Sequence, residues 1–243
     1  MADALSKLNS ITEEAEETIP SLISKAVDEG FHPFIYNDDL YIYKSGVYNI
    51  QTKKGMLAEI RHVIPSETLD KISVNAQKNA IELVFARAER IDSIPRHYDL
   101  LNVRNGIYDI LNDVLLPHDP KYKMNYILQV NYNPEAKAEK FMTFIDKTFK
   151  GRQKLIANVQ ETSGYLISDC PPIKEFILLK GESNTAKSAY TQIAKNMYGW
   201  QYINSVTMKD LTNEYYLSTM CSKKLNICGE SESTVLRDLT IIK

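Results

Sequence analysis

The segment Gly181-Glu-Ser-Asn-Thr-Ala-Lys-Ser188 decides how the fold of this chain is interpreted. It matches the pattern G-x-x-x-x-G-K-[S/T] at every specified position except one, because alanine replaces the second glycine. The apolar run Glu175–Lys180 comes immediately before it, and a stretch that favours a helix, Ser188–Tyr198, comes immediately after it. A strand, a tight loop and a helix in this order predict an α/β domain that binds phosphate groups.

Each part of the loop has a physical role in that interpretation. The tightly wrapped backbone turns successive N–H groups toward a phosphate, and the N-terminus of the following helix adds partial positive charge. Lys187 is placed to neutralise the β- and γ-phosphates, and the Ser188 hydroxyl to join the ligands of Mg²⁺. The predicted cofactors are therefore ATP and Mg²⁺. The candidate binding residues are Gly181, Glu182, Ser183, Asn184, Thr185, Ala186, Lys187 and Ser188.

Two alternatives stay open at this loop. The Cβ of Ala186 costs about 1–3 kcal/mol if the φ angle of that residue is positive, whereas a negative φ leaves the alanine nearly unstrained. An ordinary polar turn between a strand and a helix, with a lysine at this place by chance, is the structural alternative to a nucleotide site.

A second, acidic element is expected downstream of the loop. The predicted strand Lys224–Cys228 is followed by Gly229, Glu230 and then Glu232. A carboxylate at the end of a strand beside the loop can hold a water of the metal and activate the attacking water. We therefore identify Glu230 and Glu232 as candidate catalytic residues, and Glu230 also as a candidate metal ligand. A solvated turn that carries two glutamates is the alternative.

The predicted order of elements divides the chain into three parts. Residues 1–30 favour helices, residues 31–170 an α+β accessory domain, and residues 171–243 a partial phosphate-loop ATPase domain of the α/β class. Pro171-Pro172 marks the second boundary, because two prolines end a helix. Strands are expected at 40–43, 46–50, 100–103, 106–110, 114–116, 126–130 and 202–206, and helices at 5–15, 20–30, 68–90, 134–149 and 152–168, with an amphipathic stretch at 57–64.

Composition and charge narrow the function. Hydrophobic residues make up 44% and charged residues 25%, which is typical of a soluble globular protein. The net charge is −2, so contact with nucleic acid must come from a local patch or a ring of subunits. Cys170, Cys221 and Cys228 lack paired spacing, which favours reduced thiols over disulfides or zinc. With no signal peptide and no apolar run near the roughly 20 residues of a membrane span, we expect a cytoplasmic protein without membrane contact.

The loop, the stretch Lys224–Glu232 and several upstream segments together resemble the phage and plasmid primase–helicase family, whose members are superfamily-3 helicases related to poxvirus nucleoside triphosphatases. The resemblance implies a homo-oligomeric, hexameric ring that uses ATP to move along single-stranded or forked DNA in replication, with a primase or another replication protein as a further partner. It gives Lys187 and Ser188 the phosphate and Mg²⁺ contacts and Glu230 the acidic role. The upstream segments that carry it are Tyr41–Tyr48, Leu101–Asp109, Pro117–Pro120, Val130–Pro134 and Gly164-Tyr165.

Two departures from the family pattern matter. Gly229 stands where many ATPases have an aspartate, so the division of roles between Glu230 and Glu232 stays open. The chain ends at Lys243, before the positions where the resemblance implies a polar sensor residue, a DNA-contacting hairpin and an arginine finger. We therefore expect this chain alone to bind nucleotide weakly and to unwind no duplex. The alternative function is a truncated, non-enzymatic binding or regulatory module that acts through its accessory domain on a partner replication protein.

Overall fold

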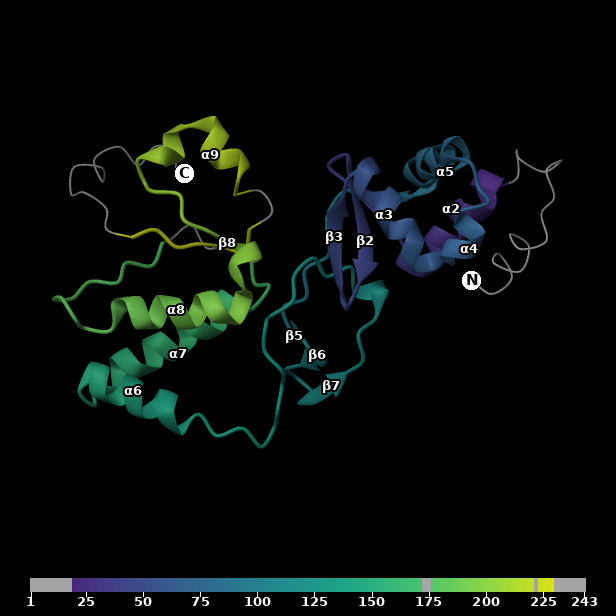
Figure 1. The fold of residues 1–243 in the computed structure, drawn as a ribbon. Helices are drawn as coiled ribbons and strands as arrows, with labels where there is room; N and C mark the ends of the chain where they lie inside the picture. The colour runs from purple at the N-terminus through teal and green to yellow at the C-terminus, as the bar shows by residue number, and fades with distance from the viewer. Residues whose placement is uncertain (1–18, 172–175, 221–222, 230–243) are drawn as a thin grey trace. The chain divides into compact units, whose positions relative to one another are not determined.

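The computed structural model describes residues 19–171, 176–220 and 223–229 (Figure 1). Helices and strands are mixed along the chain in an α/β fold, as predicted. The chain divides into two compact units, of which unit 1 comprises residues 1–95 and 119–125, and unit 2 comprises residues 96–118 and 126–243. The units do not separate at residues 30 or 170, and the functional division predicted there stays a prediction. The helix expected at residues 5–15 lies outside the described residues.

Unit 1 contains a four-stranded sheet in the order β3-β2-β1-β4. Neighbouring strands β1, β2 and β3 are antiparallel, whereas β4 pairs with β1 in parallel. Positive φ angles at Asn37 and Asp38, and again at Ser45 and Gly46, give each hairpin a tight turn whose twist matches the strands. The two strands predicted at 40–50 are confirmed, and β1 and β4 are additional. The strands are β1 (Phe34–Tyr36), β2 (Asp39–Lys44), β3 (Val47–Gln51) and β4 (Glu89–Arg90).

Helices cover this sheet and share one continuous hydrophobic core with it. α2 packs along α5, and both contact α3. Fully buried side chains from α2, α3 and the sheet meet in the core, so the amphipathic helices and the alternating strands bury their apolar faces against each other. The helices are α2 (Ile19–Phe31), α3 (Lys53–Val63), α4 (Ser66–Leu69) and α5 (Val74–Arg87).

The helix predicted at residues 68–90 is confirmed over Val74–Arg87, but its continuity and its ends are wrong. Ser73 interrupts it, because its hydroxyl oxygen accepts a hydrogen bond from the Ala76 N–H at 3.2 Å and so begins α5. At the other end, Glu89–Arg90 leaves the helix to pair with β1. Helical periodicity alone does not mark either break, since one depends on a polar cap and the other on a strand that is distant in sequence.

Unit 2 begins with a three-stranded antiparallel sheet, which confirms three predicted strands. The strand predicted at 126–130 is reduced to one bridge between Val103 and Leu128. Beside it, the buried Asn102 uses its side-chain amide to donate to the Tyr126 carbonyl at 2.8 Å, so a side chain replaces a ladder bond there. The strands are β5 (Leu100–Val103), β6 (Gly106–Asp109) and β7 (Val114–Leu116).

The helices of unit 2 follow this sheet in sequence. α6 begins at Glu139 rather than at Pro134, because Asn133 organises a turn in which its side chain accepts from the Glu135 N–H at 3.0 Å. α7 and α8 lie side by side (Figure 1), and the hydroxyl oxygens of Ser163 and Tyr190 are 2.8 Å apart. The helices are α6 (Glu139–Phe149), α7 (Gln153–Ile167), α8 (Lys187–Tyr198) and α9 (Glu214–Ser218).

Two short strands, β8 (Ile203–Asn204) and β9 (Leu225–Asn226), form a parallel pair and are shorter than predicted. The Asn226 side chain bonds both the N–H and the carbonyl of Val206, at 2.8 and 2.9 Å, and so ends the pairing. The strand predicted at 175–180 is wrong over 176–180, which has no regular structure. No described strand pairs with these residues, and an apolar run without a partner strand cannot form a ladder.

Candidate functional site

The loop Gly181–Ala186 leads directly into α8, as the sequence pattern predicts. Asn184 and Ala186 both have left-handed backbone conformations, with φ angles of 61° and 65°, and Thr185 lies between them without a positive φ. Alternation of this kind forms a concave nest whose N–H groups converge on one point. The first N–H groups of α8 have no intrahelical acceptor and face the same end of the helix. Left-handed residues alternate in this loop as they do in anion-binding nests, and the loop ends at a helix N-terminus.

Lys187, the first residue of α8, folds its side chain back across this loop. Its Nζ donates to the carbonyl of Glu182 at 2.6 Å and to that of Gly181 at 2.8 Å, and lies 3.3 Å from Thr185 Oγ1. Thr185 Oγ1 in turn donates to the Glu182 carbonyl at 2.7 Å. Within the described residues, no carboxylate forms an ion pair with Lys187. The loop is thus wrapped around a positive charge that, among residues 19–171, 176–220 and 223–229, contacts carbonyl and hydroxyl oxygens and pairs with no carboxylate.

The open question about Ala186 is answered by its φ of 65°. Ala186 is the N-cap residue of α8 and caps it without a side-chain hydrogen bond. A residue with a Cβ in this region costs about 1–2 kcal/mol relative to the right-handed conformation, so the alanine is on the strained side of the two alternatives. The strain is confined to this turn, where a glycine would fit without steric strain.

Ser188 is exposed on the first turn of α8, next to Lys187. Glu230 and Glu232 lie outside the described residues, so their candidate roles stay predictions. The chain that leads toward them is described as far as Gly229, through β9 and its parallel pairing with β8. Among the described residues, no three His, Cys, Asp or Glu side chains cluster in a way that could hold a metal ion.

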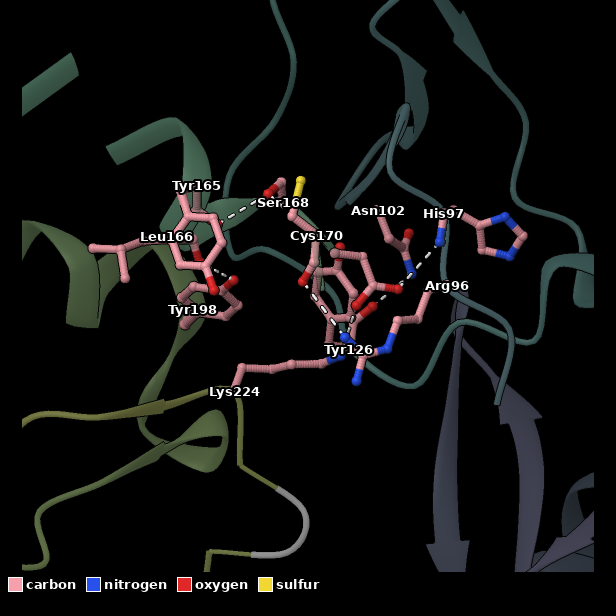
Figure 2. Close-up of polar contacts among 11 residues, drawn as sticks. Arg96, His97, Asn102, Tyr126, Tyr165, Leu166, Ser168, Cys170, Tyr198 and Lys224 are labelled. Atoms are coloured by element: carbon pink, nitrogen blue, oxygen red, sulfur yellow. Dashed lines mark hydrogen bonds and ion pairs between the residues drawn. The ribbon is translucent and has the colours of Figure 1, made fainter. Parts of the chain in front are cut away.

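A network of polar contacts fixes the start of β9 within unit 2 (Figure 2). The Lys224 Nζ lies 3.4 Å from Asp169 Oδ1, with about a quarter or less of either side chain exposed. The other carboxylate oxygen of Asp169 accepts a hydrogen bond from the backbone N–H of His97 at 3.2 Å. Arg96 Nη1 donates to the Cys170 carbonyl at 3.5 Å. The Lys224 ammonium also lies 4.2 Å from the centre of the Tyr126 ring, a cation–π contact.

Burial sets the electrostatics of this network. It lowers the pKa of Lys224, and the neighbouring Asp169 opposes that shift. Burial also raises the pKa values of Tyr126 and Tyr198, since a phenolate here would lose its hydration beside the Asp169 carboxylate. Tyr198, the last residue of α8, donates its hydroxyl to the Leu166 carbonyl at the end of α7. The network therefore holds both helices and the strand that precedes Gly229 in one arrangement.

Sequence reasoning did not identify Asp169 or Lys224 as partners. Asp169 is a single charged residue and Lys224 follows another lysine, Lys223, and nothing in their local spacing distinguishes them from surface charges. Their pairing across 55 sequence positions exists only because α7 and β9 meet in the folded unit. The signal available in the sequence was weak: an acidic residue directly after a helix, and a lysine at the head of an apolar strand.

Comparison with known proteins bears on the upstream part of the chain. The sequence model of the family described as D5 N terminal like matches residues 10–150, more than half of the 243 residues. The chain belongs to this D5 family of primase–helicases. A search of the curated proteins found no match.

The D5 match confirms the family to which the upstream segments pointed, and with it the replication theme. The matched residues end before Gly181, so the roles proposed for the loop depend on its own sequence and geometry. In the described part of this D5-family chain, every helix is too short or too polar to cross a membrane.

Proposed function

We propose that this D5-family chain binds ATP with Mg²⁺ at the loop Gly181–Ser188 and belongs to a replicative helicase that couples ATP hydrolysis to the unwinding of DNA. The observation that carries the proposal is the position of the Lys187 ammonium, which lies inside a wrapped loop against two backbone carbonyls. A half-exposed lysine in this position can exchange its carbonyl contacts for a phosphate with little movement, because its charge already lies against the loop.

The residues present fit a nucleoside triphosphate. The nest at Asn184–Lys187 offers converging N–H groups, and the α8 N-terminus adds its partial positive charge. Lys187 neutralises phosphate charge, and the Ser188 hydroxyl is placed one residue further along the first turn, where it can join the metal's ligands. When bound, the nucleotide and its Mg²⁺ supply the phosphoanhydride bond whose hydrolysis releases the free energy for motion.

The acidic role in this proposal belongs to Glu230, with Glu232 as the second carboxylate. A carboxylate that follows β9 orients the attacking water and accepts its proton. The parallel pairing of β8 with β9 supports this placement, because it brings the chain before Gly229 into the same small sheet that follows α8. The division of work between the two glutamates stays open.

The wider functional proposal follows from the D5 family. As part of a primase–helicase, the chain would act on single-stranded or forked DNA as a homo-oligomeric, hexameric ring, together with a primase or another replication protein. With a net charge of −2, affinity for DNA has two possible sources, a local basic patch or several subunits that surround one strand, and the ring would use the second.

The test is a titration of the purified chain with a fluorescent ATP analogue and Mg²⁺. We expect saturable binding, and we expect Lys187→Ala to weaken it about 10- to 150-fold, the effect of removing a charged hydrogen-bond donor. Lys180→Ala is the matched control, because it removes the same charge from an exposed position next to the loop. Its affinity should stay within about twofold of the unmodified chain.

Two results would count against the proposal. One is the absence of saturable binding by a chain whose circular dichroism shows it to be folded. The other is equal affinity in the Lys187→Ala and Lys180→Ala variants, which would mean that the loop lysine contacts no phosphate.

A further inference from the structure

The end of α8 opposite to the loop opens onto a groove of about 670 Å³ that lies entirely within unit 2. We call it the Trp200 groove, and its principal lining residues are Arg104, Gln129, Gln192, Lys195, Trp200 and Gln201. They come from the β5–β6 turn, the segment after Tyr126, the second half of α8 and the 3₁₀ turn Trp200–Tyr202. Four separate segments thus contribute to one polar surface.

Trp200 is the least expected feature of this groove. Its side chain is 85% exposed, although tryptophan is among the residues with the most apolar surface to bury. The neighbours at either side are anchored, since Tyr198 and Tyr202 are both buried in the core of unit 2. The ring is therefore presented to solvent from a fixed backbone, and its exposure is not the result of a loosely packed chain end.

The backbone around Trp200 is fixed by hydrogen bonds and by one glycine. The Gly199 N–H donates to the Lys195 carbonyl at 2.8 Å, and the Tyr202 N–H donates to the Gly199 carbonyl at 3.2 Å. Gly199 has a φ of 80°, and a Cβ there would come within 2.7 Å of Gln201 Oε1. Only glycine allows the chain to turn here while the side chains of Gln129 and Gln201 stay in place.

The charge of the groove has one sign. Arg104 and Lys195 line it, and none of the described aspartates or glutamates does, although the whole chain carries 31 acidic residues against 29 basic ones. Within the described residues neither cation forms an ion pair. Arg104 Nη2 instead donates to Gln129 Oε1 at 2.9 Å, which orients the guanidinium beside an amide. Lys223 adds a further cation at the edge, where its Nζ donates to the Gln201 carbonyl at 2.7 Å.

We propose that the Trp200 groove binds single-stranded nucleic acid, with a base stacked on Trp200 and backbone phosphates held by Arg104 and Lys195. An exposed aromatic ring next to unpaired cations is the combination that binds unpaired strands, because every base has a face that can stack and every linkage carries a charge. The side-chain amides of Gln129, Gln192 and Gln201 can bond base edges or sugars in several orientations. A duplex offers no free base face, so it should bind more weakly.

This inference does not depend on the proposed nucleotide site; it gives a place on this chain to the nucleic acid that the proposed function names. α8 carries the loop at its N-terminus and Lys195 in its second half, so one helix connects the two sites. A surface for another protein is the competing explanation of an exposed tryptophan. The acid-free lining favours a polyanion, and the experiments below separate the two.

Trp200 is the only tryptophan in the chain, so its fluorescence reports directly on the groove. The unmodified full chain is titrated with oligo-dT and, in a second arm, with oligo-U, under excitation at wavelengths that the tyrosines do not absorb. We expect saturable quenching in at least one arm and weaker quenching by a duplex of the same length. The two arms show whether the strand is DNA or RNA.

Charge variants test the phosphate contacts while they keep the reporter. In Arg104→Gln/Lys195→Gln, we expect weaker binding of oligo-dT and a salt dependence whose logarithmic slope is smaller by about 1.4, at about 0.7 for each lost phosphate contact. Lys140→Gln/Lys147→Gln is the matched control, because both lysines are exposed on α6, away from the groove. That control should keep the slope of the unmodified chain.

Stacking is tested with labelled oligo-dT and fluorescence anisotropy. We expect Trp200→Ala to weaken binding about 5- to 150-fold and Trp200→Phe to weaken it less, because phenylalanine keeps an aromatic face. Tyr215→Ala removes another exposed aromatic ring, 73% exposed on α9, and should change the affinity little. Lys187→Ala should also leave oligonucleotide binding intact, so a failure of the nucleotide site and a failure of this groove give different results.

Either of two results would overturn the proposal. The first is no quenching by any single strand while the Trp200 emission shifts with protein concentration, as a protein interface would produce. The second is an equal loss of affinity in the groove variant and in the α6 control, which would indicate a diffuse electrostatic attraction without a site.

Discussion

Unit 1 and the part of unit 2 around α8 contrast sharply in how they are packed. Unit 1 buries sixteen apolar residues in one cluster that joins its helices to its sheet. The main cluster of unit 2 has five buried residues, three of them tyrosines, and in the described part of the chain α7 has no buried residue while α8 buries only Tyr198. The side chains of Phe176 and Leu178 before the loop are more than half exposed.

The difference in packing places the dense core in unit 1 and the candidate binding sites in unit 2. A dense apolar core stabilises a fold but leaves no polar group or backbone N–H for a ligand. The loop, the Trp200 groove and the strand that precedes Gly229 all lie in the sparsely packed unit 2, where polar groups and backbone N–H groups remain accessible. The D5 match at residues 10–150 covers unit 1 and ends before the loop, so the family's signature falls mainly on the stable part.

The largest expected effect comes from the unit 1 core. Ile60 of α3 is fully buried, and Ile60→Ala should lower the free energy of unfolding of unit 1 by about 2–5 kcal/mol, through lost burial and the cavity that remains. Denaturant-dependent hydrogen exchange read by mass spectrometry measures the loss, because its peptides report on unit 1 and on unit 2 separately. Ile60→Val is the control, at about 0.5–1.5 kcal/mol. If both signals shift together in Ile60→Ala, the two units unfold as one and the contrast drawn between them is wrong.

The next effect concerns the ion pair that organises β9. Lys224→Met leaves the Asp169 carboxylate largely buried with only the His97 N–H as an assigned donor, so we expect unit 2 to lose about 1–3 kcal/mol of unfolding free energy. The Asp169→Asn variant and the double variant complete a double-mutant cycle. Additive losses in that cycle would show that the pair contributes no coupling and that apolar contacts alone hold β9.

A smaller effect, of opposite sign, is expected at the loop. Ala186→Gly removes the strain of a left-handed alanine at the expense of chain entropy, so we expect a net gain of about 0.5–1 kcal/mol in the stability of unit 2. Asn184→Gly is the control, because asparagine tolerates this conformation and has less strain to release. Destabilisation by Ala186→Gly would mean that the alanine makes contacts that outweigh its φ angle.

The smallest effect is a dependence on pH in the sheet β5–β7. Asp113 accepts hydrogen bonds from the hydroxyls of Tyr132 at 2.8 Å and Tyr108 at 2.9 Å, and these lower the pKa of its carboxyl below 3.8. A depressed pKa in the folded state contributes stability above pH 3.8 and loses it as the pH falls through the folded value. In the double variant Tyr132→Phe/Tyr108→Phe, the free energy of unfolding should therefore fall less steeply as the pH is lowered into the acid range. An unchanged acid limb would contradict this role.

Local patterns in the sequence anticipated much of the fold. Alternation at Leu40–Tyr43 and the turn residues around Ser45 predicted the β2–β3 hairpin, since the preferences of aromatic and β-branched residues and of tight turns have local steric causes. The helix that begins at Lys187 was anticipated by the loop pattern before it. What local patterns missed were breaks and partners: the cap at Ser73, the parallel pairing of Glu89–Arg90, and the lack of a partner strand for residues 176–180.

The candidate site shows the same division. The identity of the loop residues, including the alanine at a glycine position, was available from Gly181–Ser188 alone, because a phosphate nest and its lysine are contiguous in the chain. The contacts of Lys187 with the carbonyls of Gly181 and Glu182, and the positive φ of Ala186, required coordinates. The roles of Glu230 and Glu232 stay predictions.

The sequence by itself determined the features whose cause lies within a few residues: the hairpins, the amphipathic helices and a loop with the spacing of a phosphate site. Only the tertiary structure decided which distant groups meet, as when Asp169 pairs with Lys224, or Arg104 reaches the same groove as Trp200. The physical reason is range. Backbone sterics and hydrogen bonds between near neighbours depend on residues that are close in the sequence. Burial and charge pairing depend on which elements pack together, and the same local pattern is compatible with several packings.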